Sequence, residues 1–196
     1  MIVPIVEGES EVISVPVLIR RILSERFSVH QNVVARPIRK HRNKIIQVGE
    51  LERYIDLAQT RRTGTRAILI TLDADDDCPA ELSAELLGRA KAQASHLVHS
   101  VVIAKMEFEA WFLGALESLR GSCGLGDNIQ NHSDPESVRG AKEALSSLMV
   151  EGTHYLSIQD QVRMASQFDL NMAQANCPSF DKLVRDIESL VNQLKP

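Results

Sequence analysis

Long apolar runs are missing from this 196-residue sequence, and no stretch approaches the roughly 20 apolar residues that a membrane-spanning helix requires. The first residues also lack the basic and then apolar pattern of a secretory signal peptide. Cysteine is scarce, since Cys78, Cys123 and Cys177 are far apart and show no C-x-x-C spacing. We therefore expect a cytoplasmic protein with reduced thiols and no zinc site.

Several common enzyme motifs are also absent. The sequence contains no G-x-S-x-G, and its glycine cluster at 121–126 follows a predicted helix, so it does not form a nucleotide-binding loop. His96 and His99 have H-x-x-H spacing but lie at the start of a predicted strand, where a two-histidine metal site is not expected. The net charge of −4 does not by itself require nucleic acid as a partner.

Strand and helix patterns alternate over the first 120 residues. Apolar runs predict strands over 2–6, 32–38, 66–72 and 97–104, and 3.6-residue periodicity predicts helices over 10–27, 44–61, 79–96 and from 110. Pro4 indicates an edge or early ladder position, and Pro16 indicates either a helix that starts near Ser14 or a kink. The alternation predicts an α/β fold with a mostly parallel sheet of about four strands and flanking helices.

Beyond residue 120 the pattern changes. A glycine-rich and polar stretch predicts a long loop, and helical patterns follow over 135–150, 159–175 and 178–194. We therefore expect two parts: a core over 1–120 and a helical C-terminal extension over 121–196 that packs on the same domain.

Acidic residues follow three of the four predicted strands. Glu7 and Glu11 follow the first strand, Asp73 and Asp75 the third, and Glu107 and Glu109 the fourth, just after Lys105. Because parallel strands share one carboxyl end, these groups are expected along one rim of the sheet. Oxygen ligands without histidine or cysteine suit Mg²⁺ or Mn²⁺. Taken singly, each acid has a simpler explanation as a solvated turn residue or a first-turn helix acid.

A basic stretch follows the second predicted strand. It comprises Arg36, Arg39, Lys40, Arg42 and Lys44, with His41 among them. Such a stretch can hold a phosphate backbone, in which case binding should weaken steeply with salt. An exposed, solvated loop explains it equally well.

The sequence V-E-G-E-S-E, followed about 65 residues later by L-D-A-D after an apolar strand, resembles the Toprim domain. Topoisomerases, bacterial primases, small ribosomal-RNA maturases and the overcoming-lysogenization-defect nucleases share that domain. The chain is most similar to Toprim-like proteins that are often encoded beside an ATPase. Their recurring motifs correspond here to 7–11, 36–44, 72–75, 105–112 and 177–180, so the resemblance spans nearly the whole chain.

The resemblance implies roles for individual residues. Glu7 would be a general acid/base or a metal ligand, Asp73 and Asp75 would hold a divalent metal, and Glu11 would complete the two-metal site of a nuclease. Glu107 and Glu109 are further candidate ligands, and Lys105 would stabilise charge on the phosphate. Neither tyrosine lies near the motifs, so a covalent topoisomerase mechanism is not expected.

The leading hypothesis is therefore a metal-dependent nuclease that acts on DNA or RNA, with a separately encoded ATPase as partner, in phage defence or genome maintenance. One alternative is a binding or regulatory subunit of an ATPase complex that keeps the fold without catalysis. A phosphohydrolase acting on small esters is a third reading, but such enzymes place D-x-D after the first strand, whereas here it follows the third.

Overall fold

The computed structural model describes residues 1–61 and 63–194, which build a four-stranded sheet with all strands parallel. The strand order is β2-β1-β3-β4. The strands are β1 (Ile2–Val6), β2 (Ile38–Arg39), β3 (Ala67–Asp73) and β4 (Val98–Ala104). The α/β fold class predicted from the alternating pattern is therefore confirmed.

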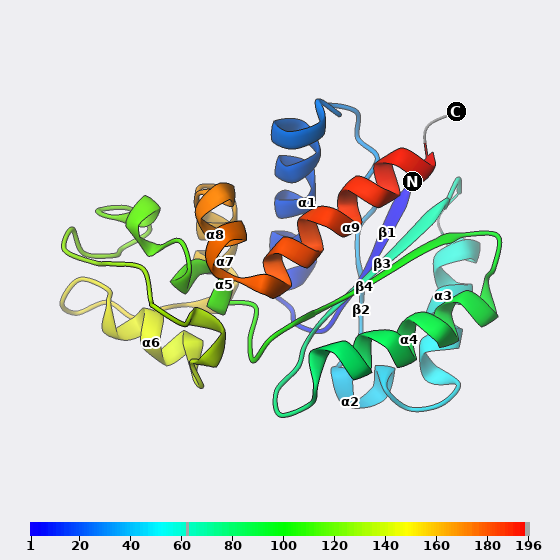
Figure 1. The fold of residues 1–196 in the computed structure, drawn as a ribbon, viewed down its shortest axis with the longest axis horizontal. Coiled ribbons are helices and arrows are strands. Elements are labelled where there is room, and N and C mark those ends of the chain that lie inside the picture. Colours follow the sequence, from blue (N-terminus) through cyan, green and yellow to red (C-terminus); the bar gives the residue numbers. More distant parts are fainter. Residues whose placement is uncertain (62, 195–196) are drawn as a thin grey trace.

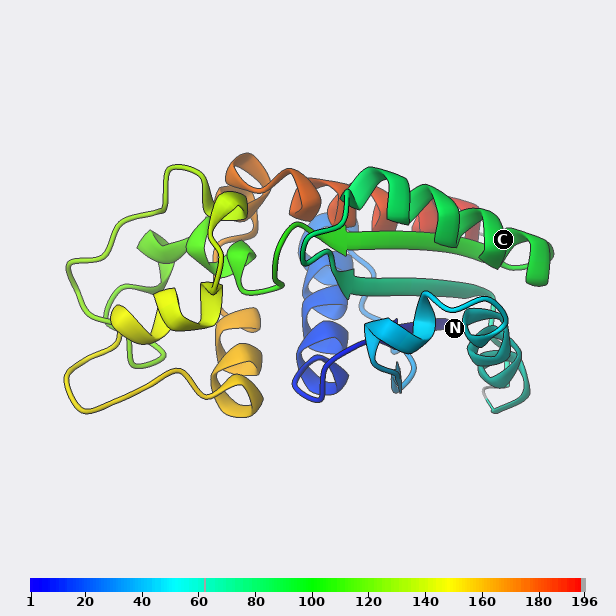
Figure 2. The same cartoon turned by 90° about the horizontal axis from the view of Figure 1, so that it is seen from below.

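Helices cover both faces of this sheet, and a further group of helices lies beyond one end of it (Figures 1 and 2). The helices are α1 (Glu11–Phe27), α2 (Arg42–Ile45), α3 (Glu50–Arg61), α4 (Pro79–Gln93), α5 (Ala110–Leu113), α6 (Ala141–Ser147), α7 (Ser157–Ala165), α8 (Leu170–Asn176) and α9 (Pro178–Leu194), with short 3₁₀ turns at Leu116–Leu119 and Pro135–Ser137. Helices α1 and α9 pack on one face of the sheet, and α2, α3 and α4 pack on the other.

The side chains of β1 alternate between two apolar layers, which explains why the strand is buried on both faces. Ile2 and Val6 belong to the layer beneath α1 and α9, whereas Val3 and Ile5 belong to the layer beneath α3 and α4. Because strand side chains point alternately to opposite faces, a continuous apolar run is what a sheet covered on both sides requires.

Pro4 lies in an inner strand but interrupts one of its two ladders. The backbone groups of Ile2 and Val6 bond toward the β2 side, through Val33, Ala35 and Lys40. Pro4 faces the same side by strand alternation and has no N–H to donate. Regular pairing is accordingly limited to a bridge between Ile2 and Val34 and to the two residues of β2. The second strand, predicted over 32–38, is therefore much shorter than expected.

Several predicted helices are divided or shifted. The helix expected over 44–61 is two helices, α2 and α3, separated by a turn in which Gly49 has a φ of 85°. The segments 135–150 and 159–175 are likewise broken, the second at Asp169, whose side chain caps α8 through Met172 N. Helix α1 begins at Glu11 and continues through Pro16. Periodicity alone did not reveal these breaks because the apolar positions continue across them.

The C-terminal helices share a core with the sheet. Helix α9 packs against β4 and α1, and Ser100 Oγ of β4 donates to Asp186 Oδ2 of α9 at 2.6 Å. Trp111 and Phe180 stack edge to face, with ring centroids 5.4 Å apart. All three cysteines are free. Within residues 1–61 and 63–194, no helix is both long and apolar enough to cross a membrane.

Candidate functional site

A cavity of about 320 Å³ lies at the carboxyl ends of β1 and β3. Four of the acids expected from the sequence line it together: Glu7, Glu11, Asp73 and Glu109. Other residues in the lining include Glu9, His41, Lys142, Ser157, Ile158 and Gln161. The structure thus brings together acids from three strand ends and adds side chains from α6 and α7.

The first two acids are joined by a local turn between β1 and α1. The Glu11 carboxylate accepts hydrogen bonds from the backbone N–H groups of Glu7 and Gly8, both at 3.2 Å. A Cβ atom on Gly8 would lie 2.8 Å from Glu11 Oε1, so a larger residue there would push the carboxylate away. The spacing E-G-x-x-E therefore holds Glu11 over the end of β1, and it leaves Glu7 Oε2 buried without a hydrogen-bond partner in the described part of the chain.

The two aspartates after β3 point in different directions. Asp73 ends the strand and lines the cavity, and its Oδ1 accepts a hydrogen bond from Phe108 N at 2.8 Å. Asp75 has a φ of 50° and lies beyond the strand, where its Oδ2 is 3.7 Å from Arg42 Nη1 and its side chain is 63% exposed. Asp75 therefore does not line the cavity, because the left-handed backbone at this residue follows the end of the strand and its side chain lies beside Arg42.

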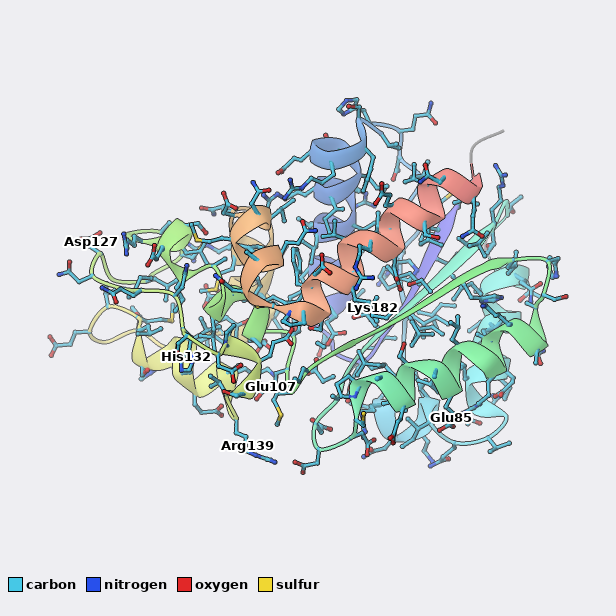
Figure 3. All side chains as sticks on the ribbon, viewed as in Figure 1. Glu85, Glu107, Asp127, His132, Arg139 and Lys182 are labelled. Atoms are coloured by element: carbon cyan, nitrogen blue, oxygen red, sulfur yellow. The ribbon has the colours of Figure 1, made fainter. Side chains whose placement is uncertain are left out.

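The two glutamates after β4 also diverge. Glu109 is fully buried, and its Oε1 accepts hydrogen bonds from Tyr155 Oη at 3.0 Å and Gln161 Nε2 at 3.1 Å. Glu107 lies where α6 meets the end of the sheet (Figure 3), and its Oε1 accepts from Ala141 N at 3.1 Å. Glu109 is thus the member of the pair that faces the cavity, whereas Glu107 attaches α6.

Lys142 is a cation of the cavity that the sequence analysis did not identify. Its Nζ lies 3.0 Å from Glu107 Oε2 and 3.5 Å from Glu109 Oε2. Tyr155 and Gln161 were also missed, as was Ser14, whose Oγ donates to Gln161 Oε1. Lys142 and Gln161 belong to α6 and α7, and Tyr155 lies in the loop before α7. They are far along the chain from the acids, and a helical pattern does not say which other segment a helix will meet.

The carboxylates resist ionisation together. Burial raises the pKa of Glu11 to about 7, and the nearby Glu109 and Glu7 carboxylates raise it as well, against two backbone donors that lower it. Burial, followed by repulsion from Glu11 and Glu109, raises the pKa of Asp73 well above its ordinary value. Burial also raises the pKa of Glu7. Ionising all of these acids together would therefore put more negative charge into the cavity than Lys142 neutralises, and a bound cation would favour the ionised forms.

The donor chemistry of this cavity fits a hard divalent cation. The acids offer only oxygen, and two of their buried atoms, Glu7 Oε2 and Glu109 Oε2, lack hydrogen-bond partners among the described residues. The arrangement of these acids in space, however, does not yet form a metal site. Within residues 1–61 and 63–194, no three carboxylate, imidazole or thiol groups are arranged to share one ion. A bound cation would require the side chains to move closer together.

Lys105 lies away from these acids. It is exposed and lines a different cavity of about 570 Å³ between α4 and the start of α9, with Cys78, Leu87, Ile103 and Pro178 among its neighbours. The expectation that Lys105 acts at the carboxylate cavity is therefore revised, and Lys142 is the lysine found there.

The basic stretch is only partly available to a ligand. Arg42 is 7% exposed, pairs with Asp77 and donates to the Ala74 carbonyl at 3.3 Å, so its expected contact with nucleic acid is revised to a structural role. Lys40 lies over the Tyr54 ring at 5.6 Å. Arg36, Arg39 and Lys44 are exposed. Because Arg39 pairs with Val6 in the sheet, this stretch leaves the sheet on the same rim as Glu7.

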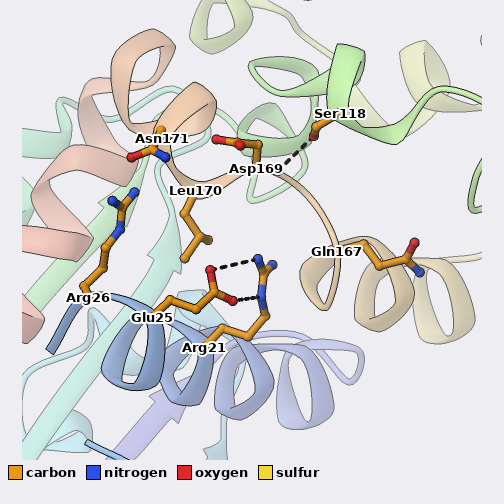
Figure 4. A pocket seen from close by; sticks show the side chains of 8 residues that line it. All are labelled: Arg21, Glu25, Arg26, Ser118, Gln167, Asp169, Leu170 and Asn171. Atoms are coloured by element: carbon orange, nitrogen blue, oxygen red, sulfur yellow. Dashed lines mark hydrogen bonds and ion pairs between the residues drawn. The ribbon is translucent and has the colours of Figure 1, made fainter. Parts of the chain in front are cut away.

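A third cavity, of about 470 Å³, lies between α1 and the α7–α8 junction (Figure 4). Its lining combines Arg21 and Arg26 with Glu25 and Asp169, and Arg21 is already bonded to Glu25 at 2.9 Å. Cations and anions are balanced there, unlike in the carboxylate cavity. The carboxylate cavity is therefore the candidate functional site.

Comparison with known proteins places the chain in a family but does not add an activity. Searches among curated proteins and among solved structures gave no match. The profile of one family, described as "Domain of unknown function (DUF4276)", matches residues 6–188. Because that match covers most of the sequence and includes all four acids of the cavity, the chain belongs to the DUF4276 family.

Proposed function

We propose that this protein is a divalent-metal-dependent phosphodiesterase of the Toprim type that cleaves nucleic acid. The observation that carries the proposal is the cavity lined by Glu7, Glu11, Asp73 and Glu109, in which a fully buried carboxylate has an oxygen without a hydrogen-bond partner among the described residues. Negative charge that is only partly neutralised in such a place is costly unless a further cation relieves it. The resemblance of V-E-G-E-S-E and L-D-A-D to Toprim motifs supports the same reading.

The four acids would hold Mg²⁺ or Mn²⁺, and each is supported differently. Glu11 is fixed by backbone donors, Asp73 by Phe108 N, and Glu109 by Tyr155 and Gln161. Burial raises the pKa of the Tyr155 hydroxyl, as does its Glu109 partner, so it remains a protonated donor. Glu7 has an unbonded oxygen and is therefore the acid best placed to accept a proton from an attacking water. A bound divalent cation would supply Lewis-acid activation and neutralise charge on a phosphate.

A polymeric substrate is favoured over a small phosphate ester. Arg39 and the residues after it leave the sheet beside Glu7, and Arg36, Arg39 and Lys44 are exposed. Cations on the rim of a carboxylate site can hold the phosphates that flank the reacting one. The resemblance to proteins encoded beside an ATPase favours a partner ATPase, and a role in defence or genome maintenance.

The test compares cleavage of supercoiled plasmid and labelled single-stranded RNA in Mg²⁺, Mn²⁺ or EDTA. The informative variant is Asp73→Asn, because an asparagine Oδ1 still accepts the hydrogen bond from Phe108 N while the charge is removed. The matched control is Asp76→Asn, whose side chain is 75% exposed and pairs with Arg139 at the surface. We expect metal-dependent cleavage that falls about a hundredfold or more in Asp73→Asn and is unchanged in the control.

Absence of metal-dependent cleavage by the wild-type protein, with the partner ATPase supplied, would contradict the proposal. A complex with the ATPase that forms equally well with wild type, Asp73→Asn and Glu7→Gln would then favour a binding or regulatory subunit.

A further inference from the structure

The ammonium of Lys142 lies against the acids that would bind the metal. Its Nζ is 3.0 Å from Glu107 Oε2 and 3.5 Å from Glu109 Oε2, and the side chain lines the cavity. Glu109 is fully buried, and its Oε2 has no hydrogen-bond partner within the described chain. The ammonium therefore partly neutralises a buried carboxylate oxygen without binding it closely.

The backbone holds Lys142 at this position. Glu107 uses one oxygen to bond Ala141 N and the other to bond Lys142 Nζ, so the first turn of α6 is attached to the β4–α5 loop at two points. The Lys142 side chain is nevertheless 41% exposed. Its head can leave the cavity for solvent without disturbing the Glu107–Ala141 bond.

From this geometry, and resting on the metal-binding function proposed above, we propose that Lys142 is the resident counter-ion of the carboxylate cavity and competes with the divalent cation for Glu109. A divalent cation bound at Glu109 Oε2 would lie only a few ångströms from the Lys142 ammonium, and like charges at that distance repel strongly. The cation must therefore displace Lys142 Nζ before the acids can close around it. This also accounts for the acids being near one another yet not arranged around a single point within the described residues.

Direct titration with Mn²⁺ tests the inference independently of catalysis. Isothermal titration calorimetry of the full chain would compare wild type with Lys142→Met, which keeps a similar length without the charge, and with Lys142→Arg, which keeps the charge. The matched control is Arg139→Met, since Arg139 lies three residues away, is 74% exposed and pairs with Asp76 rather than with the cavity. We expect Lys142→Met to bind Mn²⁺ at least about tenfold more tightly than wild type, and Arg139→Met to change affinity less than about twofold.

The possible outcomes separate this inference from the proposed function. Weaker or unchanged Mn²⁺ binding in Lys142→Met would overturn the inference while leaving a metal site intact. Absence of Mn²⁺ binding in every variant would overturn both. Tighter binding in Lys142→Met by a protein that cleaves no nucleic acid would support the inference and contradict the nuclease. Lys142→Gln provides a second neutral variant, and circular dichroism shows whether each variant is folded.

Discussion

Residues with the same charge, two positions apart, have different roles in this protein. Asp73 and Asp75 differ because Asp75 has a φ of 50°, and Glu107 and Glu109 differ because the backbone turns between them into α5, with Glu109 already in helical conformation. In an extended strand, residues two apart point the same way, but a left-handed residue or the start of a helix ends that relation. One member of each pair lines the cavity, and the other forms an ion pair that holds a neighbouring loop or helix.

This difference predicts unequal effects on metal binding. Glu109→Gln should weaken Mn²⁺ binding at least about tenfold, because it removes charge from a buried ligand while keeping an oxygen for Tyr155 and Gln161. Asp75→Asn should change affinity by less than about threefold, because its side chain is exposed beside Arg42. Calorimetric titration of both variants checks this. An equal loss in both would mean that Asp75 turns into the cavity when the ion binds.

At the scale of elements, Arg89 joins three helices on one face of the sheet. From α4 it donates to the Glu52 carboxylate of α3 at 2.8 Å and to the carbonyls of Ile46 and Gln47, just after α2, at 2.9 and 2.8 Å. Helix ends leave carbonyls without partners, and an arginine can satisfy several of them at once. The break between α2 and α3 is therefore stabilised by a residue more than 35 positions away.

The Arg89–Glu52 pair predicts a pH-dependent contribution to stability. Hydrogen bonding from Arg89 lowers the pKa of Glu52 below its ordinary value of 4.5. The folded state therefore favours the ionised form, so the contribution is present above pH 4.5 and is lost as the pH falls through the lowered value. Glu52→Gln should reduce the free energy of unfolding by about 0.5–1 kcal/mol at pH 7 and by much less in acid. Urea unfolding at both pH values measures this, with the exposed Glu188→Gln as control.

Two glycines in different elements predict opposite effects of the same substitution. A Cβ on Gly114, directly after α5, would collide with Cys177 Sγ and approach Asn176 Cβ to 3.4 Å. A Cβ on Gly88, within α4, would meet nothing within 4 Å. Gly114→Ala should therefore destabilise the fold by about 1–3 kcal/mol, and Gly88→Ala should stabilise it by about 0.5–1 kcal/mol. Thermal unfolding measures both effects. A midpoint for Gly114→Ala equal to that of wild type would contradict the prediction and would mean that Cys177, between α8 and α9, moves aside at little cost.

At the scale of the whole molecule, the N-terminal and C-terminal parts of the chain contribute to the same apolar core layer. Helix α9 covers the sheet beside α1, and Lys182 Nζ donates to the Val101 carbonyl of the edge strand at 2.9 Å. The same apolar layer includes residues from Ile2 to Leu190. Residues 121–196 are therefore part of the domain that residues 1–120 begin.

This shared core predicts cooperative unfolding. The full chain should unfold in one transition, and a fragment of residues 1–120 should not fold alone, because one face of its sheet would lose α9. The single tryptophan, Trp111, bonds to Ser179 Oγ at 2.7 Å and so reports the contact between the two parts. Its fluorescence and far-ultraviolet circular dichroism should change together in urea. Two separated transitions would contradict the shared core.

The sequence by itself determined the sheet and the rim where the acids gather. Apolar runs of strand length, separated by helical periodicity, leave few arrangements other than parallel strands covered on both sides, and parallel strands bring the segments that follow them to one rim. The placement of Glu7, Glu11, Asp73 and Glu109 at one cavity follows from that topology.

Only the tertiary structure decided which side chains form the site. It turned Asp75 and Glu107 toward ion pairs, buried Arg42, placed Lys105 in another cavity, and brought Lys142, Tyr155 and Gln161 to the acids. Side-chain direction beyond a strand end depends on single backbone angles, and contacts between α6, α7 and the sheet join residues that local pattern cannot relate. These are long-range consequences of packing, and they become visible only when the whole chain is folded.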